Sequence, residues 1–477
     1  MISIRKYLFL LISSLVWIAG LSAQRILTID DAVQIALEHN RDIKIAKLEI
    51  DKAEARVDGA FGYAYPSIDF SAGFSHFLQK PKMPFPDFGA MLNNATYGVL
   101  FKEDVIPYDA DKFLPIDTKL QAFAQTNNYQ TKLELTQILF SARVFTGIGA
   151  AQIYLQLSKE NIKRVISKSV LNVKKAFYGV ILTRELLKIA DGRFSNAKEY
   201  LETIKSMREQ GLVSQFEELQ AEVQVENIRP ILQQLKNAHI EALGGLKILL
   251  NINQDEQIEV TGEMDYKKEP LPSEEELINE ALISNLNVKT LNIKEKLDNA
   301  QIKLARTEYW PSFAGFANYS YAGSADKWKF QNYNSSSVGI GMSVNLFQGF
   351  RTNREVQQKR IEYNKTQTQI STLKDAVVRD VRTKLNELKR VQRQIESMDK
   401  NVKVAQQAYQ IAEDRYKTGE GIQLEVKNAD IALKQARVNY TNAVYDYSIA
   451  KAVLYDLIGR IDKKYYKFAT KYVDTEK

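Results

Sequence analysis

The stretch RYKTGEGIQLEVKNAD, from Arg415 to Asp430, is predicted to be the tip of a long helical hairpin. On both sides of it, apolar or small residues recur at alternating spacings of three and four. Such a repeat keeps one seam of each helix facing a partner, so the two arms are predicted to pack as an antiparallel coiled coil. Gly419 and Gly421 lie between the arms, where a helix needs a left-handed or open residue to end. The seam residues are Leu388, Val391, Ile395, Met398, Val402, Ala405, Tyr409, Ala412 and Tyr416 before the tip, and Val426, Ala429, Leu433, Ala436, Tyr440, Ala443, Tyr447, Ala450, Leu454 and Leu457 after it.

The N-terminus has the pattern of a secretory signal peptide. Arg5 and Lys6 precede an apolar run that continues to Gly20, and Leu21-Ser22-Ala23 precedes Gln24. Residues 1–23 are therefore predicted to be a cleaved signal. Two alternatives stay open, namely cleavage after Ser22 and an uncleaved membrane anchor, although the run is short for a bilayer of about 30 Å.

Composition argues against several classes of protein. The chain contains no cysteine, which excludes disulfides, thiolate metal sites and a lipid anchor on an N-terminal cysteine. His39, His76 and His239 lie in three different segments, so no shared metal site is expected. The 65 basic and 58 acidic residues are interspersed, and this small excess predicts no nucleic-acid partner. The sequence shows no phosphate loop, nucleophile elbow or metal-ligand spacing, so neither enzymatic activity nor a cofactor is expected.

The sequence repeats itself at an offset of 245 residues. Thr28–Asp31 and Ser273–Glu276 both have the pattern of a capping box, which starts a helix. The same offset carries Tyr65–Ser67 onto Trp310–Ser312, and the proline in each predicts a change from helix to strand. The offset also pairs Ala36 with Ala281, Leu37 with Leu282 and Asn40 with Asn285.

An alternation of period two follows each proline and predicts two strands per repeat, each with one apolar face. The predicted strands cover about 67–78, 127–139, 312–322 and 337–347. The first pair is separated by a long loop, Gln79–Gln125, and the second by a short polar loop of roughly Gly323–Ser336. The residues predicted to face lipid, if these strands join a barrel, are Ile68, Phe70, Phe74, Leu133, Leu135, Ile340 and Val344.

A long helix is predicted to follow each strand pair, from about Ile148 to Gln210 and from about Asn353 to Thr418. The tips align at an offset of 208, which pairs Gly211 with Gly419 and Glu217 with Glu425. Pro230 lies within the returning helix of the first repeat, where a kink or break is expected. The predicted organisation is a first repeat at 24–250, a connector at 251–272, a second repeat at 273–460 and a C-terminal tail at 461–477.

The four predicted strands are too few to close a barrel, so they are expected to join strands of other chains. An apolar face toward lipid and a polar face toward water would match a transmembrane barrel. Two alternatives lack such a barrel. One is a periplasmic sandwich, in which the strands pack on one another. The other is a periplasmic coiled-coil scaffold or adaptor protein, which would account for the helices alone.

The duplicated unit, the YPS and WPS switches, the LF turns at Leu139 and Leu346, and the G-x5-[DE]-x3-[AG] tip resemble the TolC-like outer-membrane efflux proteins. The resemblance covers about Leu27 to Gly459. It implies a mixed, mostly α fold with an internal tandem duplication. In that fold a trimeric, twelve-stranded transmembrane β-barrel, with four strands per chain, is continuous with a long antiparallel coiled-coil α-helical barrel. It also implies a homotrimer in the cell outer membrane, in contact with outer-membrane lipid, with its helical part in the periplasm. Its implied role is a passive channel of a tripartite efflux or type I secretion system, docked to a periplasmic adaptor (membrane fusion) protein and an inner-membrane pump.

The resemblance further implies a gate at the helical tips, closed by acidic rings and polar contacts between helices. Carried onto this sequence, the first acidic ring falls on Glu217 and Glu425, and a tyrosine of the pattern falls on Tyr416. The second ring falls on Asn428, which is uncharged. An arginine sometimes found two residues after the glycine is replaced by Gly421, so that tether is not expected.

Overall fold

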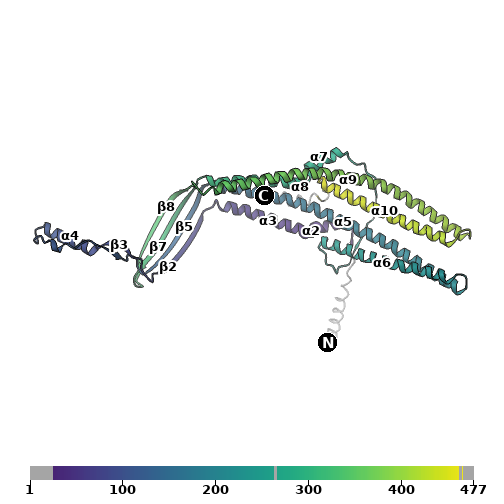
Figure 1. Ribbon diagram of the computed structural model, residues 1–477, viewed down its shortest axis with the longest axis horizontal. Coiled ribbons are helices and arrows are strands. Elements are labelled where there is room, and N and C mark those ends of the chain that lie inside the picture. The colour runs from purple at the N-terminus through teal and green to yellow at the C-terminus, as the bar shows by residue number, and fades with distance from the viewer. Residues whose placement is uncertain (1–24, 263–265, 461–464, 466–477) are drawn as a thin grey trace, which may run out of the picture. The chain divides into compact units, whose positions relative to one another are not determined.

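The computed structural model describes residues 25–262 and 266–460, together with Tyr465 (Figure 1). The predicted signal peptide and nearly all of the predicted tail lie outside the described residues. The chain divides into two compact units, one helical and one built on a sheet. The helical unit consists of Met1–Val57, Gly149–Ile302 and Val356–Lys477, and the sheet unit consists of Asp58–Ile148 and Lys303–Glu355.

The sheet unit contains four antiparallel strands in the order β2, β5, β7, β8 (Figure 1). Their bounds are β2 (Ser67–His76), β5 (Asn127–Ser141), β7 (Ser312–Ala325) and β8 (Gln331–Ser343). The proline switches are confirmed, because β2 and β7 each begin directly after the proline. The predicted bounds of β8 were wrong. The strand begins earlier because polar residues pair along β7, with Ser336 opposite Tyr319, and it ends before Val344.

The strand register places the predicted apolar residues on one face of the sheet. Directly opposite residues of an antiparallel pair share a face, and Phe70 lies opposite Leu133, which lies opposite Tyr319. The pairs Gln137–Gly315 and Gly315–Ile340 extend the same face to β8. Six of the seven residues predicted to face lipid therefore share one face, and the seventh, Val344, lies past the end of β8. The six are Ile68, Phe70, Phe74, Leu133, Leu135 and Ile340.

The two faces of the sheet differ in polarity. The charged residues of the four strands, Asp69, Lys132 and Glu134, occupy the face opposite Phe70. Lys132 Nζ lies 2.6 Å from Glu134 Oε2, so these two charges are paired. The apolar face is uncovered in the single chain, with Phe70 70% exposed and Ile340 74% exposed. A sheet with one uncovered apolar face must meet lipid or another apolar surface.

The segment 79–125, predicted as an irregular loop, contains regular structure. It holds the antiparallel ribbon of β3 (Met83–Pro86) and β4 (Thr118–Gln121), the helix α4 (Phe88–Lys102) and the 3-10 turn η1 (Ala110–Lys112). Asp87 caps α4, since its side chain accepts from the N–H groups of Gly89 and Ala90. Lys80, near the start of the segment, and Thr126, directly after it, both contact Asp326 in the turn between β7 and β8.

The helical unit contains two long hairpins with shorter helices, and four of its helices continue into residues of the sheet unit. The predicted long helices are confirmed as α5 and α9, and their return arms are α6 and α10. Of the kink or break predicted at Pro230, the break is excluded, because α6 is helical throughout. Pro230 is exposed, where water can satisfy a carbonyl that loses its partner. The kink stays a prediction. The helices are α2 (Ile29–His39), α3 (Arg41–Gly62), α5 (Ala142–Glu209), α6 (Gln215–Leu250), α7 (Glu274–Ser284), α8 (Leu286–Arg306), α9 (Arg351–Lys417) and α10 (Gln423–Leu457), with the 3-10 turn η2 (Thr307–Tyr309) after α8 and a parallel pair of short strands, β1 (Arg25–Leu27) and β6 (Ile258–Val260).

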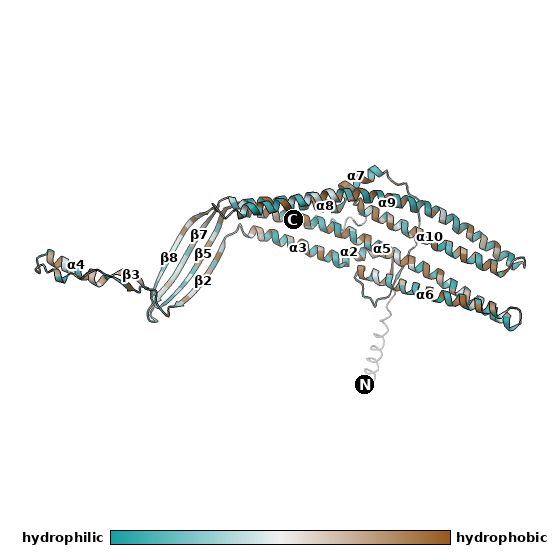
Figure 2. Cartoon of the chain, in the orientation of Figure 1, coloured by the Kyte–Doolittle hydropathy of each residue, from teal (hydrophilic) through white to brown (hydrophobic). Residues whose placement is uncertain are grey.

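The described residues of the helical unit form a first large apolar core with α5 and α6, a second with α9 and α10, and a small third cluster near the tip between α5 and α6. Figure 2 shows apolar residues recurring along α5, α6 and α10. Phe177 and Leu246 are fully buried in the first core, and Leu388 and Leu454 in the second. The predicted seam of α9 is therefore confirmed in its first part, from Leu388 to Ile395. Nearer the tip the seam residues of α9 are only half-buried or exposed, so the tip is the more loosely packed end of the hairpin.

Asn40 and Asn285, which the repeat pairs, divide the first helix of each copy in two. The side-chain oxygen of Asn40 accepts the N–H of Ile43 at 3.3 Å, and its amide donates to the Leu249 carbonyl at 2.9 Å. Asn285 makes the same contact with the Leu457 carbonyl at 2.8 Å. Each asparagine thus caps the second helix and satisfies a carbonyl at the end of its repeat's last helix.

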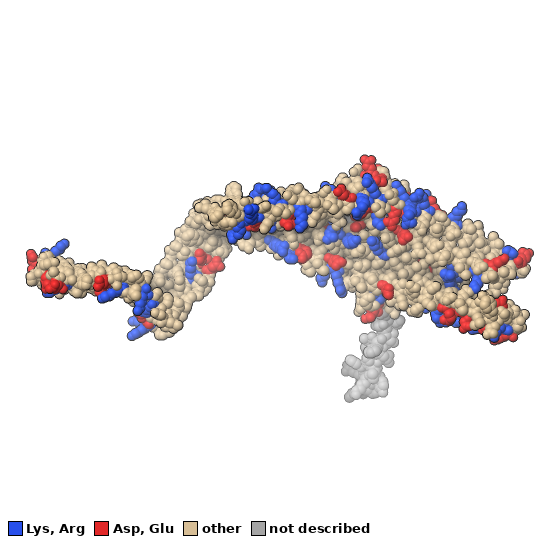
Figure 3. All heavy atoms as spheres, viewed as in Figure 1, with Lys and Arg blue, Asp and Glu red and all other residues tan. Residues whose placement is uncertain are grey.

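Charged side chains are numerous over the helices and sparse over the sheet on the face seen in Figure 3. Within the described part of the chain, no helix is both long enough and apolar enough to span a membrane.

Candidate functional site: the helical tips and the cavity between the hairpins

Both tips of the helical unit turn on a glycine in the left-handed region. Gly211 has φ of 75° and Gly419 has φ of 80°, a conformation that strains residues with a side chain. Gly421 was predicted to act in the same way, but its φ lies outside this region. A Cβ at Gly421 would lie 3.1 Å from the Cβ of Arg415 and 3.2 Å from the backbone nitrogen of Tyr416. Gly421 is therefore needed for close approach of the chain to the end of α9.

At the tip between α5 and α6, Glu217 serves the N-terminus of α6. Its carboxylate accepts the Ser214 N–H at 2.8 Å, and the Ser214 hydroxyl accepts the Glu217 N–H at 3.4 Å. These reciprocal bonds form a capping box, which satisfies two free N–H groups of the helix end. The next residue, Glu218, pairs with Arg208 from the end of α5. The predicted gate residue Glu217 is therefore bound locally to Ser214, whereas Glu218 links α6 to α5.

At the tip between α9 and α10, the aligned acid has a different partner. Ile422 occupies the cap position of α10 and offers no side-chain acceptor. Glu425 Oε2 instead lies 3.3 Å from Arg415 Nη1. Arg415 also donates from Nη2 to the Glu420 carbonyl at 3.2 Å. One arginine therefore holds both the turn and the predicted gate carboxylate.

The other two predicted gate residues lie in different environments. Tyr416 is 46% exposed and lines a cavity near the tip. Asn428 is exposed on α10, and its side chain forms no hydrogen bond within the described chain. The structure therefore brings Tyr416, but not Asn428, into a defined site.

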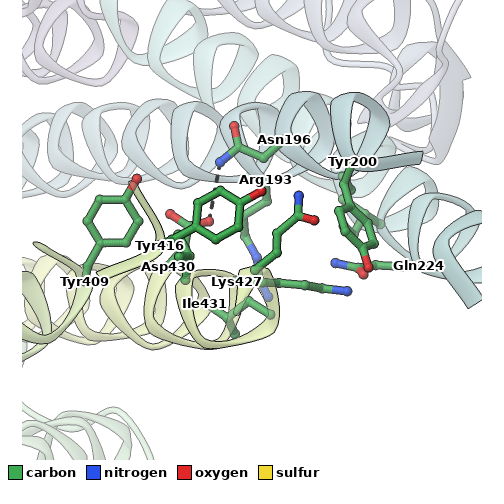
Figure 4. Close-up of a pocket in the computed structure, with 13 residues that line it drawn as sticks. Arg193, Asn196, Tyr200, Gln224, Tyr409, Tyr416, Lys427, Asp430 and Ile431 are labelled. Atoms are coloured by element: carbon green, nitrogen blue, oxygen red, sulfur yellow. Dashed lines mark hydrogen bonds between the residues drawn. The ribbon is translucent and has the colours of Figure 1, made fainter. Parts of the chain in front are cut away.

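The cavity lies between the two hairpins, has a volume of about 220 Å³ and takes residues from all four of their helices (Figure 4). Lys427 Nζ lies 4.6 Å from the ring centroid of Tyr200, so α10 contacts α5 through a cation–π pair. In the amide orientation that satisfies both of its side-chain atoms, Asn196 of α5 accepts a hydrogen bond from Lys434 Nζ of α10 at 2.8 Å, and Lys434 also pairs with Asp430 at 2.7 Å. The two hairpins are thus joined by polar contacts and not by a continuous apolar core.

The cavity wall carries two basic side chains, Arg193 and Lys427, and one acidic side chain, Asp430. Within the described residues neither Arg193 nor Lys427 has an acidic partner. Burial lowers the pKa of Lys427, because the charged form loses hydration there. Tyrosine hydroxyls from Tyr200, Tyr409 and Tyr416 add hydrogen-bonding groups. These side chains can donate hydrogen bonds to a carboxylate or carbonyl of a partner helix. The contacts between α5 and α10 would be lost if the hairpins separated.

Sequence reasoning did not single out the residues that join the two hairpins at this cavity. Gln423, Lys427 and Asp430 recur at spacings of four and three, which places them on one face of α10 beside the predicted seam. That periodicity could have indicated a polar contact face on α10. It could not identify the partner helix, because α5 is distant in sequence. No cluster of acidic, histidine or cysteine residues suited to a metal ion is found in the parts of the chain that the structure describes.

Comparison with known proteins gives the family and the fold that this chain resembles. The model of the family described as outer membrane efflux protein matches residues 277–460. The outer membrane protein TolC of Salmonella enteritidis is 21% identical over 347 residues, which cover 71% of this chain and 70% of that protein. The outer membrane efflux protein BepC of Brucella suis is 18% identical over 388 residues, covering 78% of this chain and 83% of that protein. The CmeC outer membrane channel of Campylobacter jejuni has a similar fold, with a TM-score of 0.70 at 16% identity over 94% of this chain and 90% of that chain.

Proposed function

Because this chain belongs to the outer membrane efflux protein family, we propose that three copies of it form a passive export channel. The protein is located in the bacterial outer membrane. In the proposed assembly each copy contributes four strands to a twelve-stranded transmembrane barrel, and the helices extend into the periplasm. A periplasmic adaptor protein and an inner-membrane pump are the proposed partners at the helical tips.

The observation that carries this proposal is the sheet with one uncovered apolar face. Its outer strands, β2 and β8, each have one edge without a partner in the described chain. Pairing of β8 from one copy with β2 from the next would remove every free edge and close the barrel. The alternative of a coiled-coil scaffold without a barrel leaves this face and these edges unexplained.

The two faces of β2 provide a direct test of the barrel. Phe70 and Ser71 are neighbours on opposite faces. Phe70→Arg should cost about 2–4 kcal/mol if its site lies near the middle of the bilayer, whereas Ser71→Arg should cost much less. The measurement is the yield and heat-modifiable trimer band of each variant in outer-membrane fractions. Equal tolerance of arginine at the two positions would refute the barrel.

The proposed gate is the set of tip carboxylates, Glu217 and Glu425. In a trimer each would occur three times around one axis, where like charges repel and cations are favoured. The channel should therefore prefer cations, and multivalent cations should block it from the periplasmic side. Both carboxylates already have local partners. In addition, Asn428 stands where a second acidic ring is expected, and Gly421 stands where an arginine is sometimes found. The block by multivalent cations should therefore be weak.

Planar-bilayer conductance tests the gate. The double variant Glu217→Gln with Glu425→Gln should lose most of the cation preference and of the multivalent block. Glu218→Gln is the matched control, because Glu218 pairs with Arg208 at the same tip but is not part of the predicted ring. If selectivity survives the double change, these carboxylates are only solvated tip residues.

A further inference from the structure

The helix α4 has one apolar face that nothing in the described chain covers. Phe88, Leu92, Ala95 and Val99 recur at spacings of four, three and four, which places them in one row along the helix. We call this row the α4 seam. Phe88 is 58% exposed, and Leu92 and Val99 are each 60% exposed. The spacing is that of a helix that packs against another helix.

The opposite face of α4 is packed against its own segment. Ala90 is 3% exposed. The side-chain amides of Asn93 and Asn94 donate to the carbonyls of Lys112 and Leu114, each at 2.8 Å, and Asn94 Oδ1 accepts the Leu114 N–H at 2.7 Å. These contacts fix the orientation of α4, so its seam stays turned outward.

The charge pattern selects a second copy of this helix as the occupant of the seam. Cyclic symmetry brings each residue near its own copies, so charged residues on a shared seam would repel. From Phe88 to Phe101 the helix carries no charge, and Lys102 is its single charged residue. An anionic lipid surface would require an excess of basic residues, but segment 79–125 has five basic and six acidic residues.

The size of the seam shows that it cannot assemble by itself. A fully buried aromatic side chain contributes about 150–250 Å², so one phenylalanine with three smaller residues stays well below the roughly 800 Å² per partner of a stable interface. Association would therefore depend on the barrel, which would hold three copies close together at a high effective concentration. The segment begins at the end of β2 away from the Pro66 switch, so all three copies would lie at the same end of the sheet.

We propose that the α4 seams of three copies pack against one another beyond the strand ends and form an apolar three-helix cluster at the outer mouth of the channel. This inference rests on the proposed trimer. The cluster adds contacts between subunits outside the barrel and narrows the path for exported material there.

Site-specific cross-linking tests the cluster, and the chain has no native cysteine to interfere. Ala95→Cys places a thiol at the centre of the α4 seam. A short tris-maleimide reagent should convert most of the purified full-length Ala95→Cys protein into covalent trimers. Asp111→Cys is the control, because Asp111 is exposed on the segment that covers the other face of α4 and should give little covalent trimer.

A second variant tests the packing without a cross-linker. Leu92→Glu should lower the temperature at which the trimer dissociates on a gel, because three carboxylates would meet. Leu120→Glu, at an exposed leucine of the same segment outside the seam, should leave that temperature unchanged. If the trimer forms but neither result is seen, the cluster is refuted and the channel stands. If no trimer forms in light scattering of the unmodified protein, both proposals are refuted.

Discussion

At the tip between α5 and α6, Ser214 caps the returning helix and holds Glu217, whereas at the tip between α9 and α10 Ile422 occupies the same place and holds nothing. The aligned acid Glu425 pairs with Arg415 instead. The two turns share a left-handed glycine, so their backbones are alike. The comparison teaches that the role of a tip carboxylate depends on the cap residue three positions before it. An alignment of the two acids alone does not reveal that difference.

The largest expected effect tests what the tips share. Gly211→Ala and Gly419→Ala each place a side chain at a positive φ, which should cost about 1–2 kcal/mol. Hydrogen exchange measured by mass spectrometry should show faster opening of the changed tip and no change at the other tip. A tip that tolerates alanine without faster exchange would show that its turn is not held in the left-handed conformation.

A smaller effect tests what distinguishes the tips. Ser214→Ala removes the capping box of α6 and should lower the stability of its first turn by about 1 kcal/mol. Ile422→Ala is the matched control, because Ile422 makes no side-chain capping bond and its replacement should not speed exchange in the first turn of α10. Similar losses at both positions would mean that the two tips are capped alike.

The smallest effect would convert one tip into the other. Ile422→Ser creates the pattern Ser-x-x-Glu with Glu425 and should stabilise the first turn of α10 by about 0.5–1 kcal/mol. Glu425 would then turn toward the helix end and release Arg415. Slower exchange in the first turn of α10 is the expected result. Unchanged exchange would show that the ion pair with Arg415 outweighs a capping box at this tip.

Local patterns were sufficient to predict the order of the helices and strands. The proline switches before Ser67 and Ser312, the alternation in the strands and the left-handed turns at Gly211 and Gly419 each depend on a few neighbouring residues. For the same reason the apolar face was predictable, since alternation alone decides which strand residues share a face. The candidate gate residues were named from the resemblance and remain proposals.

Other features depended on partners that are remote in sequence. The start of β8 was missed because polar residues enter a strand when β7 provides hydrogen bonds to their backbone. The helix α4 was not predicted, and its orientation depends on contacts with the segment around Lys112. Pro230 was expected to kink or break α6, but α6 continues through it, because its exposed position makes the lost hydrogen bond tolerable.

The sequence by itself determined the order of the helices and strands, the strand faces and the glycine turns, because periodicity and backbone preference act over a few residues. Tertiary structure alone decided the pairing of Glu425 with Arg415 and the polar contact of Lys427 with Tyr200. These depend on which side chains of different helices come within bonding distance. Residues 200 and 427 are brought together by the packing of two hairpins, and no local pattern in either one specifies the other.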